Sequence, residues 1–197
     1  MEMIKKVDNI DSVLSREDHA ELIDGAIVVT DVTSVAHNNA VLEIATALRQ
    51  HIASHNGKCR VFTENVALFC NELRKDDKDN NLFMPDIMTV CKEDGIKDDG
   101  VHTAPLFVAE ITSDSTKKND YGRKMVVYGD IGVQEYWVVD LQRKVVVRYL
   151  SENWFAPEVF VYDSTIRSFG FPVSCQALWQ SVSLSLERDS HCHFQCG

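Results

Sequence analysis

The sequence predicts an α/β (α+β) domain in which a mixed β-sheet is flanked by helices. Three observations support this class. A segment at residues 35–54 has the apolar spacing of a long helix, a second helical segment follows at 117–130, and short apolar stretches typical of strands lie between and after them. The chain of 197 residues is long enough to form a hydrophobic core, so we assign residues 1–188 to a single domain.

The N-terminal part is predicted to form a hairpin. Residues 21–29 contain two short apolar stretches around Asp24-Gly25, a pair typical of two-residue hairpin turns. The polar residues 1–20 before it are expected to form a short helix or a loose segment.

The helix predicted at 35–54 has clear start and stop signals. Thr33 and Ser34 supply hydroxyl groups that can cap its first turn, and Asn56-Gly57 is expected to end it. Its apolar residues recur at helical spacing and form one stripe that can pack against a sheet. The stripe consists of Val41, Ile44, Ala45, Leu48 and Ile52.

Two polar residues near these elements can belong either to the framework or to a site. His37 lies one turn before Val41 on the helix stripe, and we interpret it as a core or capping histidine, with a site role as the alternative. Glu64 shares a face with Phe62 in the strand predicted at 60–70. A sheet end open to water is the favoured position for this carboxylate, and a third acidic metal ligand is the alternative.

Two further carboxylates lie in strongly apolar strands. Asp86 follows Pro85 in the strand predicted at 82–91, and Glu110 lies near the end of the strand predicted at 105–111. An unpaired buried carboxylate is costly, so each needs a partner or a shifted pKa. Adjacent strands lie about 4.8 Å apart, which lets carboxylates on neighbouring strands reach one Mg²⁺ or Mn²⁺ ion. We therefore expect a metal-dependent phosphodiesterase site, with solvated strand ends as the alternative.

The second half of the chain continues the pattern of helix and strands. Hydroxyl groups of Ser113, Ser115 and Thr116 can cap the helix at 117–130, and Gly129 and Gly132 are expected to end it. Strands are expected at 135–141, 144–150 and 154–162, and polar loops at 71–81 and 92–100. The mixed apolar end at 169–186 is expected to form a short strand with a turn of helix at 175–181.

The composition limits the class of protein. A net charge of −10 argues against a protein that coats nucleic acid non-specifically, because such binding requires many cation–phosphate contacts. It does not exclude a nuclease with a local basic patch. The sequence has no apolar run near the roughly 20 residues of a membrane span, so we expect no membrane association.

The six cysteines have no framework spacing, and residues 1–12 contain no apolar segment of the kind found in secretion signals. We therefore expect reduced thiols and a cytoplasmic protein.

An ordered series of residues runs through the chain: Glu21-Leu22-Ile23-Asp24-Gly25, His37, Pro85-Asp86, Glu110-Ile111-Thr112-Ser113, Ser115-Thr116, Asp120, Lys124, Tyr128, Gly132-Val133, Glu135-Tyr136-Trp137 and Asp140. This series resembles the Uma-two family, whose members are regarded as nucleases with the restriction-endonuclease-like fold. The resemblance spans roughly residues 20–185 and is most specific between Glu110 and Asp140.

The resemblance implies a variant of the Asp…Glu-x-Lys nuclease site. On that basis Asp86 and Glu110 correspond to the metal-binding acids. Thr112 occupies the position of the usual lysine, two residues after the glutamate. The family places its lysine on the following helix, and Lys124 matches that position.

Some residues near the site leave its composition open. Lys117 and Lys118 compete with Lys124 for the catalytic role, and Tyr128 is expected to be a packing residue with a hydrogen-bonded hydroxyl group. The chain departs from the family at Asp114, where a proline is common, and at Leu106, where an aspartate is common.

We expect a Mg²⁺- or Mn²⁺-dependent endonuclease that hydrolyses DNA, in which Asp86 and Glu110 bind metal and Lys124 assists. A homodimer is possible because cutting both strands is easiest with two sites related by a two-fold axis. A catalytically silent module of the same fold, acting in binding or structure, is the alternative that the acidic net charge favours. The local basic excess at 117–124 favours the nuclease, and a hydrolase of another phosphate ester is a third alternative.

The C-terminal segment contains four possible soft-metal ligands at 191–196. Zinc sites ordinarily use two separated pairs of such residues, so we expect a disordered tail at 189–197, with metal binding as the alternative.

Overall fold

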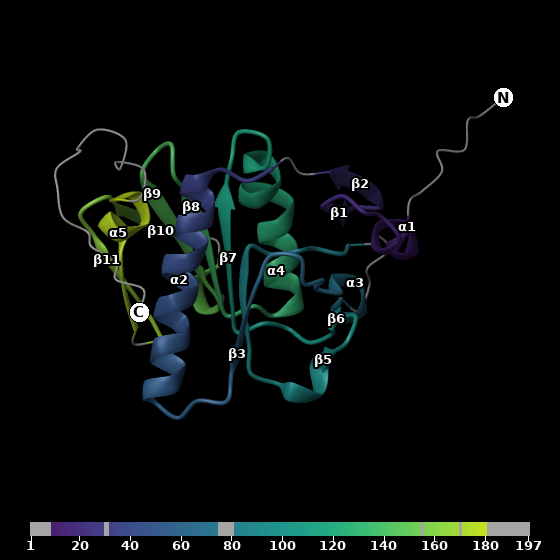
Figure 1. Ribbon diagram of the computed structural model, residues 1–197, viewed down its shortest axis with the longest axis horizontal. Coiled ribbons are helices and arrows are strands. Elements are labelled where there is room, and N and C mark those ends of the chain that lie inside the picture. Colours follow the sequence, from purple (N-terminus) through teal and green to yellow (C-terminus); the bar gives the residue numbers. More distant parts are fainter. Residues whose placement is uncertain (1–8, 30–31, 75–80, 155, 170, 181–197) are drawn as a thin grey trace, which may run out of the picture.

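The computed structural model describes residues 9–29, 32–74, 81–154, 156–169 and 171–180. Its centre is a six-stranded sheet in the order β10-β9-β8-β7-β4-β3 (Figure 1). Strands β7 and β8 pair in parallel, and the other neighbours pair antiparallel. The strands are β3 (Arg60–Thr63), β4 (Ile87–Val90), β7 (Phe107–Thr112), β8 (Glu135–Asp140), β9 (Val145–Leu150) and β10 (Glu158–Val161). The predicted mixed sheet flanked by helices is confirmed.

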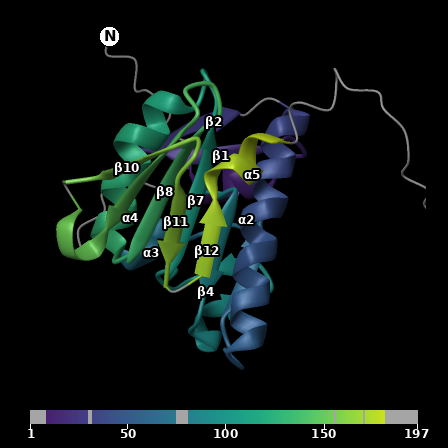
Figure 2. The same ribbon diagram turned by 90° about the vertical axis from the view of Figure 1, so that its left-hand side faces the viewer.

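Helices cover both faces of the sheet (Figure 2). Helix α2 (Val35–Ser54) packs its apolar stripe on one face, against side chains of β7 and β8. On the other face lies α4 (Met125–Ile131), which continues directly from a π-helix, η2 (Asn119–Lys124). Because both faces are covered, every residue of β4, β7 and β8 is buried, as is usual for the central strands of such sheets.

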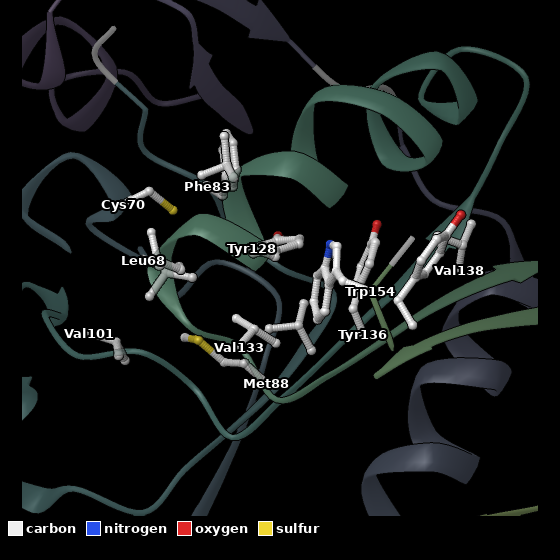
Figure 3. Packing of buried hydrophobic residues seen from close by; sticks show 14 of the residues in the cluster. Leu68, Cys70, Phe83, Met88, Val101, Tyr128, Val133, Tyr136, Val138 and Trp154 are labelled. Carbon is white, nitrogen blue, oxygen red and sulfur yellow. The ribbon is translucent and has the colours of Figure 1, made fainter. Parts of the chain in front are cut away.

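Side-chain alternation along β7 assigns each residue to one of the two cores. Phe107, Ala109 and Ile111 face α2. Val108 faces α4 and belongs to the same core cluster as Tyr128 of that helix. Figure 3 shows the packing on the α4 side, where Tyr128, Tyr136 and Trp154 lie close to Met88 and Val133. Glu110 shares the parity of Val108, so its carboxylate is directed into the α4 side of the sheet.

The predicted hairpin is present as β1 (Ala20–Ile23) and β2 (Ala26–Val29). Asp24 and Gly25 have φ values of 52° and 71°, as a tight turn with two left-handed residues requires. The remaining elements are α1 (Ile10–Leu14), α3 (Cys70–Leu73), η1 (Glu93–Gly95), β5 (Ile96–Lys97), β6 (Gly100–Val101), η3 (Ser151–Asn153), β11 (Thr165–Ser168), β12 (Phe171–Ser174) and α5 (Cys175–Gln180).

Several predicted elements differ from the structure. The strand expected at 82–91 is confined to β4, and the polar loop expected at 92–100 contains η1 and the pairing of β5 with β6. The strand expected at 60–70 ends at Thr63, because Glu64 and Asn65 adopt positive φ values of 31° and 55° that turn the chain out of the sheet. The helix expected at 117–130 begins as a π-helix, and the strand expected at 154–162 is confined to β10. The hairpin of β11 and β12 was not predicted.

The expectation of reduced thiols is wrong for one pair. Cys59 and Cys91 form a disulfide, with Cα atoms 4.0 Å apart. They lie one position beyond the paired residues Arg60 and Val90, so the antiparallel register of β3 and β4 brings them together. Cys70 and Cys175 are buried.

Within the described residues, no helix is long and apolar enough to cross a membrane. The predicted disordered tail at 189–197 and the possible metal ligands at 191–196 lie outside the described residues.

Helix α2 should stabilise the fold through its buried stripe. Ile44 is 0% exposed, and replacing it with alanine would leave a cavity against the sheet. We expect Ile44→Ala to lower the free energy of unfolding by about 2–5 kcal/mol, measured by urea titration. Leu42 on the same helix is 55% exposed, so Leu42→Ala should change it by no more than about 0.5 kcal/mol. Equal effects of the two substitutions would contradict this packing.

Candidate functional site

Carboxylates from three neighbouring strands lie in a row at one end of the sheet. Ile87 of β4 pairs with Thr63 of β3 and with Ala109 of β7. The backbone N–H of Glu64 also donates to the carbonyl of Asp86 at 3.2 Å, which extends this register by one position. The residues one position beyond the pairs are Glu64, Asp86 and Glu110. In Figure 1, β7 ends and α2 begins at the upper end of the sheet.

These side chains line a cavity of about 860 Å³. Its wall includes the predicted site residues Asp86, Glu110 and Lys124. Among the described residues that form it, six carry carboxylates and Lys124 is the one lysine. Such an excess of negative charge in a concave site attracts cations. The six acids are Glu21, Glu64, Asp86, Glu110, Asp114 and Asp120.

Lys124 is buried in a cage of acidic side chains. Its Nζ lies 3.1 Å from Oε1 of Glu110, 2.8 Å from Oε2 of Glu21 and 3.7 Å from Oδ1 of Asp120. The hydroxyl group of Tyr128 donates to the same Oε1 of Glu110 at 2.6 Å. Glu110 therefore has one oxygen held by two donors, and its Oε2 lies 3.5 Å from the backbone nitrogen of Asp86.

The helix that carries Lys124 brings three polar side chains to one face. Asp120, Lys124 and Tyr128 follow one another at intervals of four residues, along η2 and into α4. Residues four apart lie on the same side of a helix, here the side that covers β7. Single-turn π-helices of this kind occur frequently at functional sites.

The cage shifts the pKa values of its members. Burial raises the pKa of Glu110 well above its ordinary value, with Lys124 acting against this effect and Asp86 adding to it. Burial lowers the pKa of Lys124, but the carboxylates of Glu110, Glu21 and Asp120 outweigh that effect and raise it well above its ordinary value. Lys124 is therefore an ammonium ion at neutral pH.

A second group lies on the other side of Asp86. Oδ2 of Asp86 accepts the backbone N–H of Ile111 at 2.7 Å, and its Oδ1 lies 3.2 Å from Nε2 of His37. Nε2 of His37 also lies 3.6 Å from Oε1 of Glu64. The ligand atoms of His37, Glu64 and Asp86 all lie within 4.8 Å of one another, so these three residues could hold a metal ion.

His37 lies at this cavity and not in the apolar stripe of α2. Its backbone N–H donates to the side chain of the N-cap residue Ser34 at 3.1 Å. Burial lowers the pKa of His37, but the carboxylates of Asp86 and Glu64 have the larger combined effect and raise it above its ordinary value. The favoured interpretation as a core or capping histidine missed this side-chain position.

The competing lysines lie elsewhere. Lys117 forms an ion pair with Asp140 at 2.7 Å, and Lys118 is exposed outside the cavity wall. Arg123 is paired with Asp24 of the hairpin. Much of the local basic excess at 117–124 is therefore neutralised by carboxylates.

Glu21 was not predicted to be a site residue. Glu21 lies between Ala20 and Leu22 in a fully buried strand, so an isolated acid in an apolar strand could have identified it, as it identified Glu110. Its Oε1 accepts the backbone N–H of Met84 at 2.8 Å, which leaves Oε2 directed at Lys124.

A sequence model of the Uma2 family, described as "Putative restriction endonuclease", matches residues 7–179. The chain belongs to the Uma2 family. The predicted resemblance is thereby confirmed. No curated protein matches the chain.

The Uma2 chain is also similar to a solved structure, that of "a putative nuclease belonging to DUF820 from Anabaena variabilis ATCC 29413". The TM-score is 0.70 at 18% sequence identity, and the match covers 88% of this chain and 98% of the other. This likeness confirms the restriction-endonuclease-like fold. Nucleases of that fold generally use divalent metal ions, which agrees with the acidic cavity.

The acidic cage should make the stability of the Uma2 chain depend strongly on Lys124. Lys124→Met would leave the carboxylates of Glu21, Glu110 and Asp120 buried without their ammonium partner. We expect the free energy of unfolding at pH 7.5 to fall by about 3–5 kcal/mol, measured by urea titration.

The deficit of Lys124→Met should shrink as the pH falls from 7.5 to about 5. Without the ammonium ion, which lowers both values, the raised pKa values of Glu110 and Asp120 in the folded state move further above those of the unfolded chain, near 4. The folded variant then binds protons before the unfolded one does, so its stability recovers on acidification. Lys118→Met, at an exposed position on the same segment, should change stability by no more than about 0.5 kcal/mol at either pH. A deficit that is equal at both pH values would contradict the cage.

Proposed function

We propose that this Uma2 chain is a Mg²⁺- or Mn²⁺-dependent endonuclease that hydrolyses DNA phosphodiester bonds. The observation that carries the proposal is that Asp86, Glu110 and Lys124, which come from three different elements, line one acidic cavity. Membership of a family described as restriction endonucleases supports the reaction class.

The residues of the cavity fit a hard divalent cation. Carboxylate oxygens are the ligands that Mg²⁺ and Mn²⁺ prefer, and Asp86 and Glu110 are the acids that we propose as ligands. Oδ1 of Asp120 is buried without a hydrogen-bond partner among the described residues, which is a further sign of uncompensated negative charge. When bound, such a cation supplies Lewis acidity toward water and the phosphodiester.

The protein holds both acids in fixed orientations. Asp86 is anchored through Oδ2 by the N–H of Ile111, and Glu110 is anchored through Oε1 by Tyr128 and Lys124. The second oxygens also have contacts: Oε2 of Glu110 lies 3.5 Å from the backbone nitrogen of Asp86, and Oδ1 of Asp86 lies 3.2 Å from Nε2 of His37. Side chains held in this way need no rearrangement to bind a cation.

Lys124 has an electrostatic role in this proposal. The surrounding carboxylates raise the pKa of Lys124, which favours the ammonium form of the side chain. Its ammonium group can donate to a water molecule or offset the charge that develops on the phosphate. Glu21 is a positioning residue, since its Oε2 holds Nζ of Lys124 at 2.8 Å.

The alternative is a catalytically silent module that acts in binding or structure. It is favoured by the net charge of −10 and by the neutralisation of the basic excess near the site. A hydrolase of another phosphate ester is the third candidate. A homodimer that cuts both DNA strands and a cytoplasmic location remain predictions.

The nuclease proposal predicts cleavage of plasmid DNA in Mg²⁺ or Mn²⁺ that stops when EDTA is added. Asp86→Asn should reduce the rate by about 100-fold or more, because it removes a charged ligand from the site. The asparagine carbonyl can still accept the N–H of Ile111, so the fold should be retained. Glu43→Gln makes the same change of charge on the exposed side of α2 and should leave the rate unchanged.

Two measurements separate the alternatives. Calorimetry should show Mn²⁺ binding that Asp86→Ala abolishes, and absence of binding at millimolar Mn²⁺ together with no cleavage would favour the silent module. Cleavage of a small aryl phosphodiester but not of plasmid DNA would favour the third candidate.

A further inference from the structure

His37 and Glu64 belong to the same end of the sheet as the proposed acids, although they are not among them. The row of strand ends contributes Glu64 and Asp86 from adjacent positions, and the first turn of α2 contributes His37. Together they offer one nitrogen and two carboxylate ligands within 4.8 Å of one another.

The backbone at Glu64 is bent in a way that aims its side chain at this point. Glu64 and Asn65 have φ values of 31° and 55°. Residues other than glycine rarely adopt this backbone conformation, which costs about 1–3 kcal/mol per residue. If β3 continued as a regular strand, its side chains would go on alternating between the two faces of the sheet. The turn instead places Oε1 of Glu64 3.6 Å from Nε2 of His37.

The imidazole of His37 is held beside the carboxylates of Asp86 and Glu64. Ser34 caps the helix at the backbone N–H of His37, which fixes the start of α2 beside the cavity. Nε2 of His37 is buried, and no described residue forms a hydrogen bond with it in acceptable geometry. Oδ1 of Asp86 lies 3.2 Å away and Oε1 of Glu64 lies 3.6 Å away, so the nitrogen is placed between two carboxylates. A metal ion bound by all three groups would take the place of the proton on this nitrogen.

We infer that Nε2 of His37, together with Glu64 and Asp86, binds the catalytic cation directly, and that this makes the site prefer a transition-metal dication to Mg²⁺. The inference deepens the proposed function and rests on it for the role of the cation. It assigns a nitrogen ligand where the acids alone would provide only oxygen.

The chemistry of the ligands gives the preference its direction. Mg²⁺ is a hard cation that takes oxygen ligands and keeps several of its waters. Imidazole nitrogen suits transition-metal dications, and the affinity of mixed nitrogen and oxygen sites rises from Mn²⁺ toward the later metals. Mn²⁺ combines tolerance of carboxylates with a paramagnetic signal, so it is the probe that we choose.

The test uses the full chain with Mn²⁺ and pulsed electron paramagnetic resonance. A directly bound imidazole couples its nitrogen to the electron spin, so the wild-type protein should show nitrogen modulation of the Mn²⁺ echo. The modulation should change when histidine is labelled with ¹⁵N, a readout that needs no variant. It should be lost in His37→Gln and retained in His19→Gln, which alters the other histidine of the cavity wall.

Competition between Mn²⁺ and Mg²⁺, followed by calorimetry, gives the second readout. His37→Gln should weaken Mn²⁺ binding by about tenfold or more, the size of effect seen even when only groups behind a metal ligand change. Mg²⁺ binding should change far less, so the preference of the wild type for Mn²⁺ should largely disappear. Glu64→Gln is the matched comparison, because loss of an oxygen ligand should weaken both cations together.

The outcomes separate this inference from the proposed function. Bound Mn²⁺ without nitrogen modulation, or an unchanged ratio of the two affinities in His37→Gln, would overturn the inference even if the protein cleaves DNA. Nitrogen modulation in a protein that cleaves no phosphodiester would retain the site and contradict the nuclease.

Discussion

The structure depends on one buried charge that has to be compensated. Glu110 lies in β7, a central strand, and is only 3% exposed, so its carboxylate is stable only with donors supplied by other elements. Tyr128 and Lys124 supply them from the helix above, and Lys124 in turn requires Glu21 from the hairpin. A chain of ion pairs and hydrogen bonds thus links the sheet, η2 and α4, and the hairpin. The hairpin is also joined to the body of the protein by Leu22, whose N–H donates to the carbonyl of Leu82 at 2.9 Å.

This compensation is incomplete, and the imbalance is what makes the cavity a candidate site. One ammonium ion faces Glu110, Glu21 and Asp120, while the imidazole of His37 lies between Asp86 and Glu64. A framework selected for stability alone would replace such buried ions with apolar side chains, because desolvation can outweigh their attraction. Unmatched acids and the left-handed backbone at Glu64 are local departures from otherwise regular packing, and such departures concentrate at functional sites.

Much of the frame could be predicted from the sequence because it follows from local pattern. The stripe of α2, the Asp24-Gly25 turn and the apolar strands all reflect residue spacing, and the isolated acid in β7 was correctly read as needing a partner. The strand break at Glu64, the π-helix at 119–124 and the Cys59–Cys91 disulfide follow from tertiary contacts and backbone geometry that a single sequence does not reveal. His37 was misjudged for the same reason, because helical spacing places it on a stripe but does not show what faces the first turn.

The position of Lys124 shows why spacing along the chain is a weaker guide to a site than convergence in space. A lysine two residues after Glu110 would share its face of β7 and reach the cavity from the strand. Thr112 occupies that position and is 5% exposed. Its Oγ1 lies 3.4 Å from the hydroxyl oxygen of Thr116. The amine arrives instead from the covering helix, 14 residues further along the chain, and still ends 3.1 Å from the same carboxylate. The side-chain alternation of β7 directs Glu110 toward the covering helix, and the four-residue spacing along η2 and α4 directs Lys124 toward β7. The cavity therefore has an amine beside the carboxylate although the sequence motif is broken.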